Sequence, residues 1–242
     1  MITLYSLPPG LGLPVSASPF CVKADLLLRM AAVPYETVYL PDPGKGPLGK
    51  LPYIRDEGTD PPEEIPDSSL ICRHLQEHHG YDAWPGLNAR DRAAARSLTA
   101  MMEERFYWVI VYERWLEDKN WDVVRQDYFA PVPAPVRGAV AAVARKNARR
   151  SLHGHGLGRH ERATIMEFGR ADIGALSAWL GRHEYMMGPV PCALDATTYA
   201  MLSAVADATL ETEMKRCLSE TANLMAYLQR MRTRFFPMGG GG

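Results

Sequence analysis

The pattern of the chain changes once, near residue 88, and no other feature restricts the possible folds as strongly. Before that point short β-prone segments alternate with helical ones, whereas after it long amphipathic helical segments follow one another with almost no strand signal. Strands that alternate with helices favour a mixed α/β sheet, and an unbroken series of helices favours an all-α unit. We therefore predict an α/β domain over residues 1–82, an all-helical domain over residues 88–236 and a flexible tail over residues 237–242.

The composition excludes several classes of protein. With 47% apolar and 23% charged residues, a chain of 242 residues can bury a substantial core. Its net charge of -1 provides no general field that would attract nucleic acid. The apolar runs are far shorter than the ~20 residues of a membrane span, and the chain opens on a strand pattern rather than a signal peptide. The four cysteines are scattered, as is typical of reduced thiols. We expect a cytoplasmic protein without a nucleic-acid or membrane partner.

Turn residues and helix caps divide both domains into elements. In the first domain, strands are predicted over residues 2–6, 35–40, 53–55 and 64–65, and helices begin at the caps Ser18 and Asp67. In the second domain, helices are predicted over residues 90–118 (one helix or a kinked pair), 136–150, 161–183, 193–208 and 211–233. The acid Asp195 stands three residues after Cys192, the spacing of a reciprocal helix cap, and we interpret it as structural.

The sequence Ser-Pro-Phe-Cys at residues 18–21 opens the first helix, where unpaired amides and the helix dipole favour an anion. It resembles the redox motif of glutaredoxins with the first cysteine replaced by serine. Cys21 lies one turn inside the helix, and we expect it to be buried and unreactive. The hydroxyl of Ser18 can donate a hydrogen bond to a sulfur anion that a ligand brings. The alternative is that Ser18 is only a helix cap.

Two further pairs follow in the sequence: Leu51-Pro52 stands before a predicted strand, and Asp67-Ser68 stands before a predicted helix. With Ser18-Pro19 they resemble the glutathione transferase superfamily, and in particular its metaxin-like branch, which includes the failed axon connections proteins and their bacterial relatives. The stretches that carry this resemblance are residues 18–23, 49–54, 65–71, 154–160 and 194–196. They span nearly the whole chain.

The resemblance implies a thioredoxin-like glutathione-binding domain, an all-helical substrate domain and a homodimer. It implies that the Leu51-Pro52 bond is cis, with the backbone of Leu51 holding the cysteinyl unit of glutathione. Asp67 and Ser68 are expected to bind the γ-glutamyl end at a helix N-terminus. Tyr5 and then Ser16 compete with Ser18 as the group that activates the thiol, with Cys21 after them.

Several other side chains are candidates for contact with the ligands. Lys50, together with Lys45, could meet the glycine carboxylate of glutathione, or both could be ordinary solvated lysines. In the helical domain a stripe at helical spacing could form an apolar substrate pocket that faces the sulfur, or it could be interdomain core; with Met101 it comprises Arg105, Trp108, Tyr112 and Trp115.

A glycine-rich segment carries three histidines, but nothing else in the sequence completes a ligand set, and we predict no metal; the histidines are His153, His155 and His160. The neighbouring basic residues are interpreted as a solvated helix face.

These observations predict an enzyme, a glutathione transferase that conjugates the glutathione thiolate to a small hydrophobic electrophile. Glutathione is therefore the expected cosubstrate, and ring opening of a small epoxide is the preferred reaction. Two alternatives remain: a non-catalytic, protein-binding adaptor built on the transferase fold, and a glutathione-dependent thiol oxidoreductase that uses an exposed Cys21.

Overall fold

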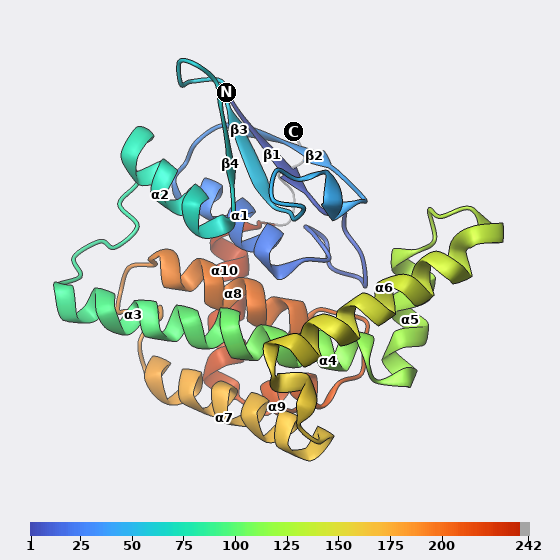
Figure 1. Cartoon of the computed structure of the whole chain (residues 1–242). Helices are drawn as coiled ribbons and strands as arrows, with labels where there is room; N and C mark the ends of the chain where they lie inside the picture. The colour runs from blue at the N-terminus through green and yellow to red at the C-terminus, as the bar shows by residue number, and fades with distance from the viewer. Residues whose placement is uncertain (238–242) are drawn as a thin grey trace.

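A four-stranded mixed sheet forms one end of the molecule (Figure 1). The computed structural model describes residues 1–237, so the predicted tail lies, except for Pro237, outside the described residues. The strands are β1 (Ile2–Ser6), β2 (Tyr35–Tyr39), β3 (Tyr53–Asp56) and β4 (Glu63–Pro66), in the spatial order β2-β1-β3-β4. β1 runs parallel to β2 and antiparallel to β3, and β3 runs antiparallel to β4.

Helices α1 (Pro19–Met30) and α2 (Ser68–His78) belong to the same end of the chain as the sheet. The alternation of β1 turns Ile2 and Leu4 into the main core, where they are 1% exposed, and α1 contributes Leu26 and Leu27 to the same core. Because β1 and β2 are parallel, the chain needs a crossover between them, and α1 supplies it.

The rest of the chain is helical and forms the other end of the molecule (Figure 1). Its centre is α8 (Ala193–Ala206), which is buried on nearly all sides and packs against α1. The surrounding elements are α3 (Ala89–Met101), α4 (Tyr107–Trp115), α5 (Asp118–Tyr128), α6 (Ala134–His155), α7 (Arg162–Leu180), α9 (Glu213–Ser219) and α10 (Ala222–Phe235), with short helical turns at Pro43–Lys45 and Leu157–Arg159. Within the described residues no helix combines the length and apolarity needed to cross a membrane.

The second domain differs from the sequence prediction in two places. Residues 90–118, predicted as one helix or a kinked pair, form α3 and α4, which are joined by a π-helical turn at Met102–Phe106. The segment after α4 folds as α5, which the sequence analysis did not predict. The predicted helix over 211–233 divides at Thr221, whose hydroxyl donates to the carbonyl of Cys217 and thereby competes with continued helix.

A buried ion pair joins the two ends of the molecule. The ammonium of Lys23, on α1, lies 2.7 Å from the carboxylate of Glu103 in the π-helical turn and 3.2 Å from the hydroxyl of Ser69 on α2. Thr197 of α8 donates to the same Glu103 oxygen at 3.2 Å. The side chains of Lys23 and Glu103 are only 4% and 15% exposed, so this pair is a specific polar contact within an apolar interface.

Candidate active site

Ser18 is the N-cap of α1, and Pro19 follows it in the first turn. The backbone of Ser18 is extended, with φ -99° and ψ 124°, but its hydroxyl makes no capping hydrogen bond to the helix. Hydrogen bonding with the Ser18 side chain is one of the weaker influences that lower the pKa of Cys21. A helix N-terminus favours negative charge, and the amides of Phe20 and Cys21 do not receive the serine cap that usually satisfies them.

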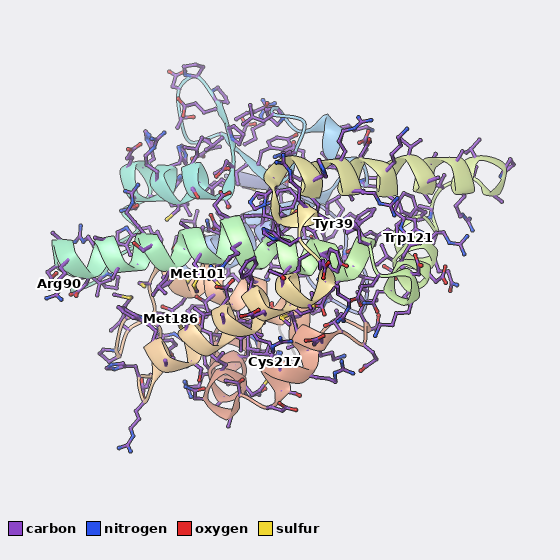
Figure 2. All side chains as sticks on the ribbon, turned by 60° about the horizontal axis from the view of Figure 1, so that its bottom comes forward. Tyr39, Arg90, Met101, Trp121, Met186 and Cys217 are labelled. Atoms are coloured by element: carbon purple, nitrogen blue, oxygen red, sulfur yellow. The ribbon has the colours of Figure 1, made fainter. Side chains whose placement is uncertain are left out.

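The loop over residues 7–17, which leads from β1 to Ser18, is anchored in the helical domain. Leu11 and Leu13 are 1% and 5% exposed and pack in one cluster with Trp121 and Phe129. Trp121 of α5 lies below α6 (Figure 2). The amide of Leu11 donates to a carboxylate oxygen of Asp127 at 2.8 Å. The helical domain thus fixes the loop by both apolar and polar contacts.

The end of this loop is held by Arg114 of α4. The guanidinium of Arg114 donates to the carbonyl of Ala17 at 2.9 Å and to the carbonyl of Ala204 on α8 at 2.6 Å. Arg114 is only 5% exposed, so these bonds form in a desolvated position where charge-assisted hydrogen bonds are strong. The residue directly before Ser18 is therefore attached to two helices of the other domain.

Ser16 and Cys21 are both fully buried behind Ser18. The Ser16 hydroxyl accepts a hydrogen bond from the amide of Ser18 at 3.2 Å, which assigns it a local structural contact. Burial raises the pKa of the Cys21 thiol, although the amide of Leu7 donates to its sulfur at 3.5 Å. The expectation that Cys21 is buried is confirmed, and a buried thiol with a raised pKa is poorly suited to thiol exchange.

A chain of contacts connects Ser18 to the other predicted glutathione-binding residues. Cys21, in the first turn of α1, packs in one cluster with Leu51. The Leu51–Pro52 peptide bond is cis, as the resemblance implied. The carbonyl of Pro52 accepts a hydrogen bond from the amide of Asp67 at 3.3 Å. The structure therefore brings together segments that lie 30 to 50 residues apart in the sequence.

Asp67 and Ser68 stand at the N-terminus of α2. Asp67 has a φ of 69°, in the left-handed region that costs a non-glycine residue energy, and its carboxylate accepts from the amide of Ser69 at 2.7 Å. Asp67 is exposed and Ser68 is buried. This geometry presents the backbone and the carboxylate of Asp67 at a helix N-terminus, where a ligand with a carboxylate and an ammonium group can bind.

Tyr5 and the two lysines have different surroundings. Tyr5 pairs with Tyr53 across β1 and β3, and their rings stack with centroids 4.3 Å apart. The alternation of β1 places Tyr5 on the face of the sheet opposite Leu4. Lys45 and Lys50 are exposed. Their loop folds back so closely that a Cβ on Gly46 would lie 1.9 Å from the carbonyl oxygen of Lys50.

Members of the predicted substrate stripe contact other helices of the second domain. Arg105 pairs with the buried Asp172 of α7, and the ring of Trp108 stacks on His155 of α6 at 4.8 Å. Trp115 packs against Trp121, with ring centroids 5.5 Å apart, and Tyr112 is half-buried. Trp115 also packs against the cluster that holds Leu11 and Leu13 of the loop before Ser18.

Two residues that the sequence analysis did not select contact the start of α1 and the loop before it. Tyr107 contacts Phe20 of α1 edge to face at 4.8 Å, and Arg114 donates to the carbonyl of Ala17. Tyr107 and Arg114 lie on one face of α4, about 100° around the helix from the face that carries Trp108 and Trp115.

The helix predicted over 136–150 continues as α6 to His155, so His153 and His155 are helical, whereas His160 follows the turn at Leu157–Arg159. His155 and His160 border an open surface groove of about 550 Å³, together with Arg105 and Arg159. Asp195 has the structural contacts that its spacing predicted, since its carboxylate accepts from the amides of Cys192 at 2.9 Å and Met186 at 2.8 Å.

A thioredoxin-like sheet, a cis-proline beside a helix N-terminus and an all-helical second half define the transferase class of glutathione-binding folds. Residues 19–120 match the family described as Glutathione S-transferase N-terminal domain, and residues 169–231 match Glutathione S-transferase, C-terminal domain. The chain belongs to the glutathione transferase superfamily.

The similar proteins include one that is named as a glutathione transferase and others that are not named as enzymes. The chain is 29% identical over 248 residues to isoprene-epoxide–glutathione S-transferase of Rhodococcus sp. (strain AD45), covering 97% of this chain and 99% of that protein. It is 29% identical to Failed axon connections of Drosophila melanogaster, covering 92% of this chain and 55% of that protein. It is 26% identical to human Metaxin-1, with 88% and 46% covered. The predicted metaxin-like branch of the superfamily is confirmed.

Solved structures show the same fold. A beta-etherase from Sphingobium sp. strain SYK-6 superimposes with a TM-score of 0.64 at 18% identity, over 96% of this chain and 95% of that one. A glutathione S-transferase of Ceriporiopsis subvermispora, solved in complex with glutathione, gives 0.63 at 17% identity over 100% and 98%. The predicted fold class is confirmed by this agreement.

Proposed function

We propose that this chain is a glutathione transferase that adds the glutathione thiolate to a small apolar electrophile. The observation that carries the proposal is the uncapped N-terminus of α1, where the Ser18 hydroxyl makes no capping bond to a backbone amide of the helix. Leu51, cis-Pro52 and Asp67 complete the glutathione site in this proposal, with Lys50 near the glycine carboxylate. Superfamily membership and the 29% identity to a glutathione transferase support it.

The thiol of glutathione needs help to ionise. A free thiol with a pKa of ~8.5 is only about 3% thiolate at neutral pH. Lowering its pKa by ~2 units takes ~2.7 kcal/mol, which a hydrogen bond from Ser18 and the helix N-terminus can supply together. The thiolate fraction then rises about 25-fold. Since nucleophilicity falls with pKa at a slope of about 0.4 to 0.5, only a few-fold gain in rate remains. Positioning of the electrophile must supply the rest.

We infer that Phe20 and Tyr107 form the wall against which the electrophile lies. Both side chains are half-buried and touch where α1 faces α4, beside Ser18. An epoxide suits this site: the sulfur attacks one ring carbon, the carbon–oxygen bond breaks, and the resulting alkoxide takes a proton from water. The name of the Rhodococcus relative, which specifies an isoprene epoxide, supports this substrate class.

Incubation with glutathione and a panel of epoxides, halides and activated alkenes, followed by mass spectrometry, tests the proposal. The parent chain should form adducts of the summed mass with the epoxides. Ser18→Ala should form them more slowly, whereas Ser97→Ala, which removes an exposed serine hydroxyl on α3, should match the parent. No adduct with any electrophile, at millimolar glutathione, would refute the catalytic proposal.

A non-catalytic, protein-binding adaptor is the second candidate. It is supported by the similarity to Failed axon connections and Metaxin-1 and by an apolar stripe on α6. Val136, Val140 and Val143 recur at helical spacing there and are 48%, 42% and 58% exposed. A glutathione-dependent rise in melting temperature together with adduct formation favours the enzyme, whereas the absence of both effects favours the adaptor.

The cytoplasmic location and the homodimer also belong to the proposal. The four cysteines are unpaired, which suits a reducing compartment. Light scattering measures the second point, since a homodimer has twice the 26.9 kDa mass of the chain.

A further inference from the structure

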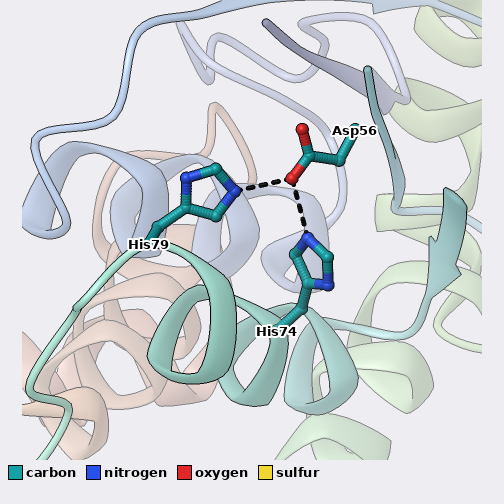
Figure 3. Close-up of side chains that lie close together, drawn as sticks. All are labelled: Asp56, His74 and His79. Carbon is teal, nitrogen blue, oxygen red and sulfur yellow. Dashed lines mark hydrogen bonds and ion pairs between the residues drawn. The ribbon is translucent and has the colours of Figure 1, made fainter. Parts of the chain in front are cut away.

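His74 of α2 and His79, the residue that follows this helix, converge on one carboxylate (Figure 3). The Nε2 atoms of His74 and His79 lie 2.8 Å and 2.6 Å from the same oxygen, Oδ2 of Asp56. The three donor atoms all lie within 4.8 Å of one another. Asp56 ends β3, so the cluster joins the sheet to the far end of the helix that starts after Asp67.

The surrounding structure holds the three side chains in place. Oδ1 of Asp56 accepts a hydrogen bond from the amide of Gly58 at 2.8 Å, which leaves Oδ2 directed at the histidines. Asp56 and His74 have side chains that are 1% and 5% exposed, whereas His79 is 22% exposed. An ion can therefore enter beside His79, and water can reach a coordination position there.

The outer nitrogen of His74 also has a carboxylate partner. Its Nδ1 atom lies 3.9 Å from Oε2 of Glu63, on β4. When Nε2 binds a cation, the imidazole proton resides on Nδ1, which then faces the Glu63 carboxylate. The neutral hydrogen-bonded form, in which Nε2 donates to Asp56, instead turns the Nδ1 lone pair toward that negative charge. The Glu63 carboxylate thus favours the form with a cation at Nε2.

We propose that Asp56, His74 and His79 form a binding site for a divalent transition metal ion of the Zn²⁺ type. Two imidazole nitrogens and one carboxylate oxygen are a donor set that such ions prefer, with water as the fourth ligand. Ligand atoms of a tetrahedral Zn²⁺ stand about 3.3 Å apart, so both Nε2 atoms need to move outward from Oδ2, and their own separation needs to adjust to the same value.

The ion is assigned a structural role. The cluster lies at the C-terminal end of α2, about 16 Å along the helix axis from Asp67. Since the glutathione site lies at the other end, the ion does not take part in conjugation. It fixes α2 against the end of β3 and stabilises the folded chain, because it binds a set of ligands that only the fold assembles.

Equilibrium dialysis of the untagged chain, stripped with a chelator and then equilibrated with Zn²⁺, tests the proposal by metal analysis. We expect one ion per chain. His79→Gln should weaken binding by about tenfold or more, since even loss of a residue that only supports a ligand costs about that much. His78→Gln is the matched control, because it removes the neighbouring exposed imidazole and leaves the three donor atoms intact.

Three further measurements distinguish binding at this cluster from adventitious binding to histidines elsewhere on the surface. Co²⁺ in place of Zn²⁺ should give the intense visible absorption of a tetrahedral site in the parent and in His78→Gln, but not in His79→Gln. Zn²⁺ should raise the melting temperature of the parent, whereas Mg²⁺, which requires an octahedron of oxygens, should not. Circular dichroism confirms that His79→Gln is folded, and Asp56→Asn provides a second variant.

The proposal is overturned if the parent binds no Zn²⁺ at micromolar concentration, which would leave Asp56, His74 and His79 as a hydrogen-bonded network only. It is equally overturned if His79→Gln binds as tightly as His78→Gln, which would move the ion to other histidines such as His155. Both results are independent of glutathione and of the conjugation assay.

Discussion

Replacement of Ser18 by alanine changes the chemistry at the start of α1 with little change in structure. The hydroxyl caps no amide of its own helix, so its removal breaks no capping bond. The loop before it remains anchored by Arg114 and Leu11, which do not contact the hydroxyl. We therefore expect the free energy of unfolding to fall by less than about 0.5 kcal/mol, the lower end of the range for N-cap serines.

The effect on bound glutathione should be larger. A hydrogen bond to a charged group contributes about 1.5–3 kcal/mol, which corresponds to about one to two pKa units of the thiol. For a rise of two units, from ~6.5 to ~8.5, the thiolate fraction at pH 7 falls about 25-fold. The more basic thiolate recovers about 8-fold in nucleophilicity at a slope of about 0.45, so turnover should fall between about 3-fold and 25-fold. Glutathione affinity should change little, because the other contacts persist.

The pH dependence of kcat/KM, together with the ultraviolet absorbance of bound thiolate, distinguishes this account from a structural one. In Ser18→Ala the apparent pKa of the bound thiol should rise. The loss of rate should therefore disappear above about pH 9, where the thiol is ionised in both proteins and the more basic thiolate of the variant reacts at least as fast. Ser18→Thr, which keeps the hydroxyl, should retain the low pKa. An equal loss of rate at every pH would contradict the argument. An unchanged rate would transfer the role to Tyr5 or Ser16.

Two further predictions concern stability and are measured by urea unfolding. Burial raises the pKa of the Glu113 carboxyl to about 7 from 4.5, so its ionisation makes folding less favourable as the pH rises from about 4.5 to about 7. The free energy of unfolding of Glu113→Gln, relative to that of the parent, should therefore increase by about 2–3 kcal/mol between about pH 5 and pH 8. A difference that does not change with pH would contradict this. Lys23→Met leaves Glu103 unpaired at the domain interface and should lower the free energy of unfolding by about 3–5 kcal/mol. Adding Glu103→Met should restore most of this stability. A loss below about 1 kcal/mol in the single variant would contradict the prediction.

Local signals in the sequence were sufficient for the α/β half of the fold. Residues 2–6 form β1 as predicted, and Ser18 and Asp67 are the N-caps at which α1 and α2 begin. These predictions succeeded because cap and turn residues act through bonds to their immediate neighbours. The mutual arrangement of the segments came from the family resemblance, since cis-Pro52 and the amide of Asp67 meet only through the sheet.

The parts that the sequence did not predict depend on contacts over long distances. The π-helical turn at 102–106 has no local signature, and it is where Glu103 meets Lys23 and Arg105 meets Asp172. The contacts of Tyr107 with Phe20 and of Arg114 with Ala17 were also not predicted. His74 and His79 have four residues between them, which is within the H-x3–5-H spacing of zinc motifs, but the sequence analysis did not select this pair. Asp56 joins them only through the sheet.

The anchored loop also determines how this protein can be recombined with others. A chimera that joins its first 82 residues to a foreign helical half would expose Leu11 and Leu13 and leave the carbonyl of Ala17 without its guanidinium. Grafts between relatives should therefore exchange the loop together with α4 and α5 as one unit. A chimera divided at the linker alone would therefore separate residues that contact one another in the folded protein.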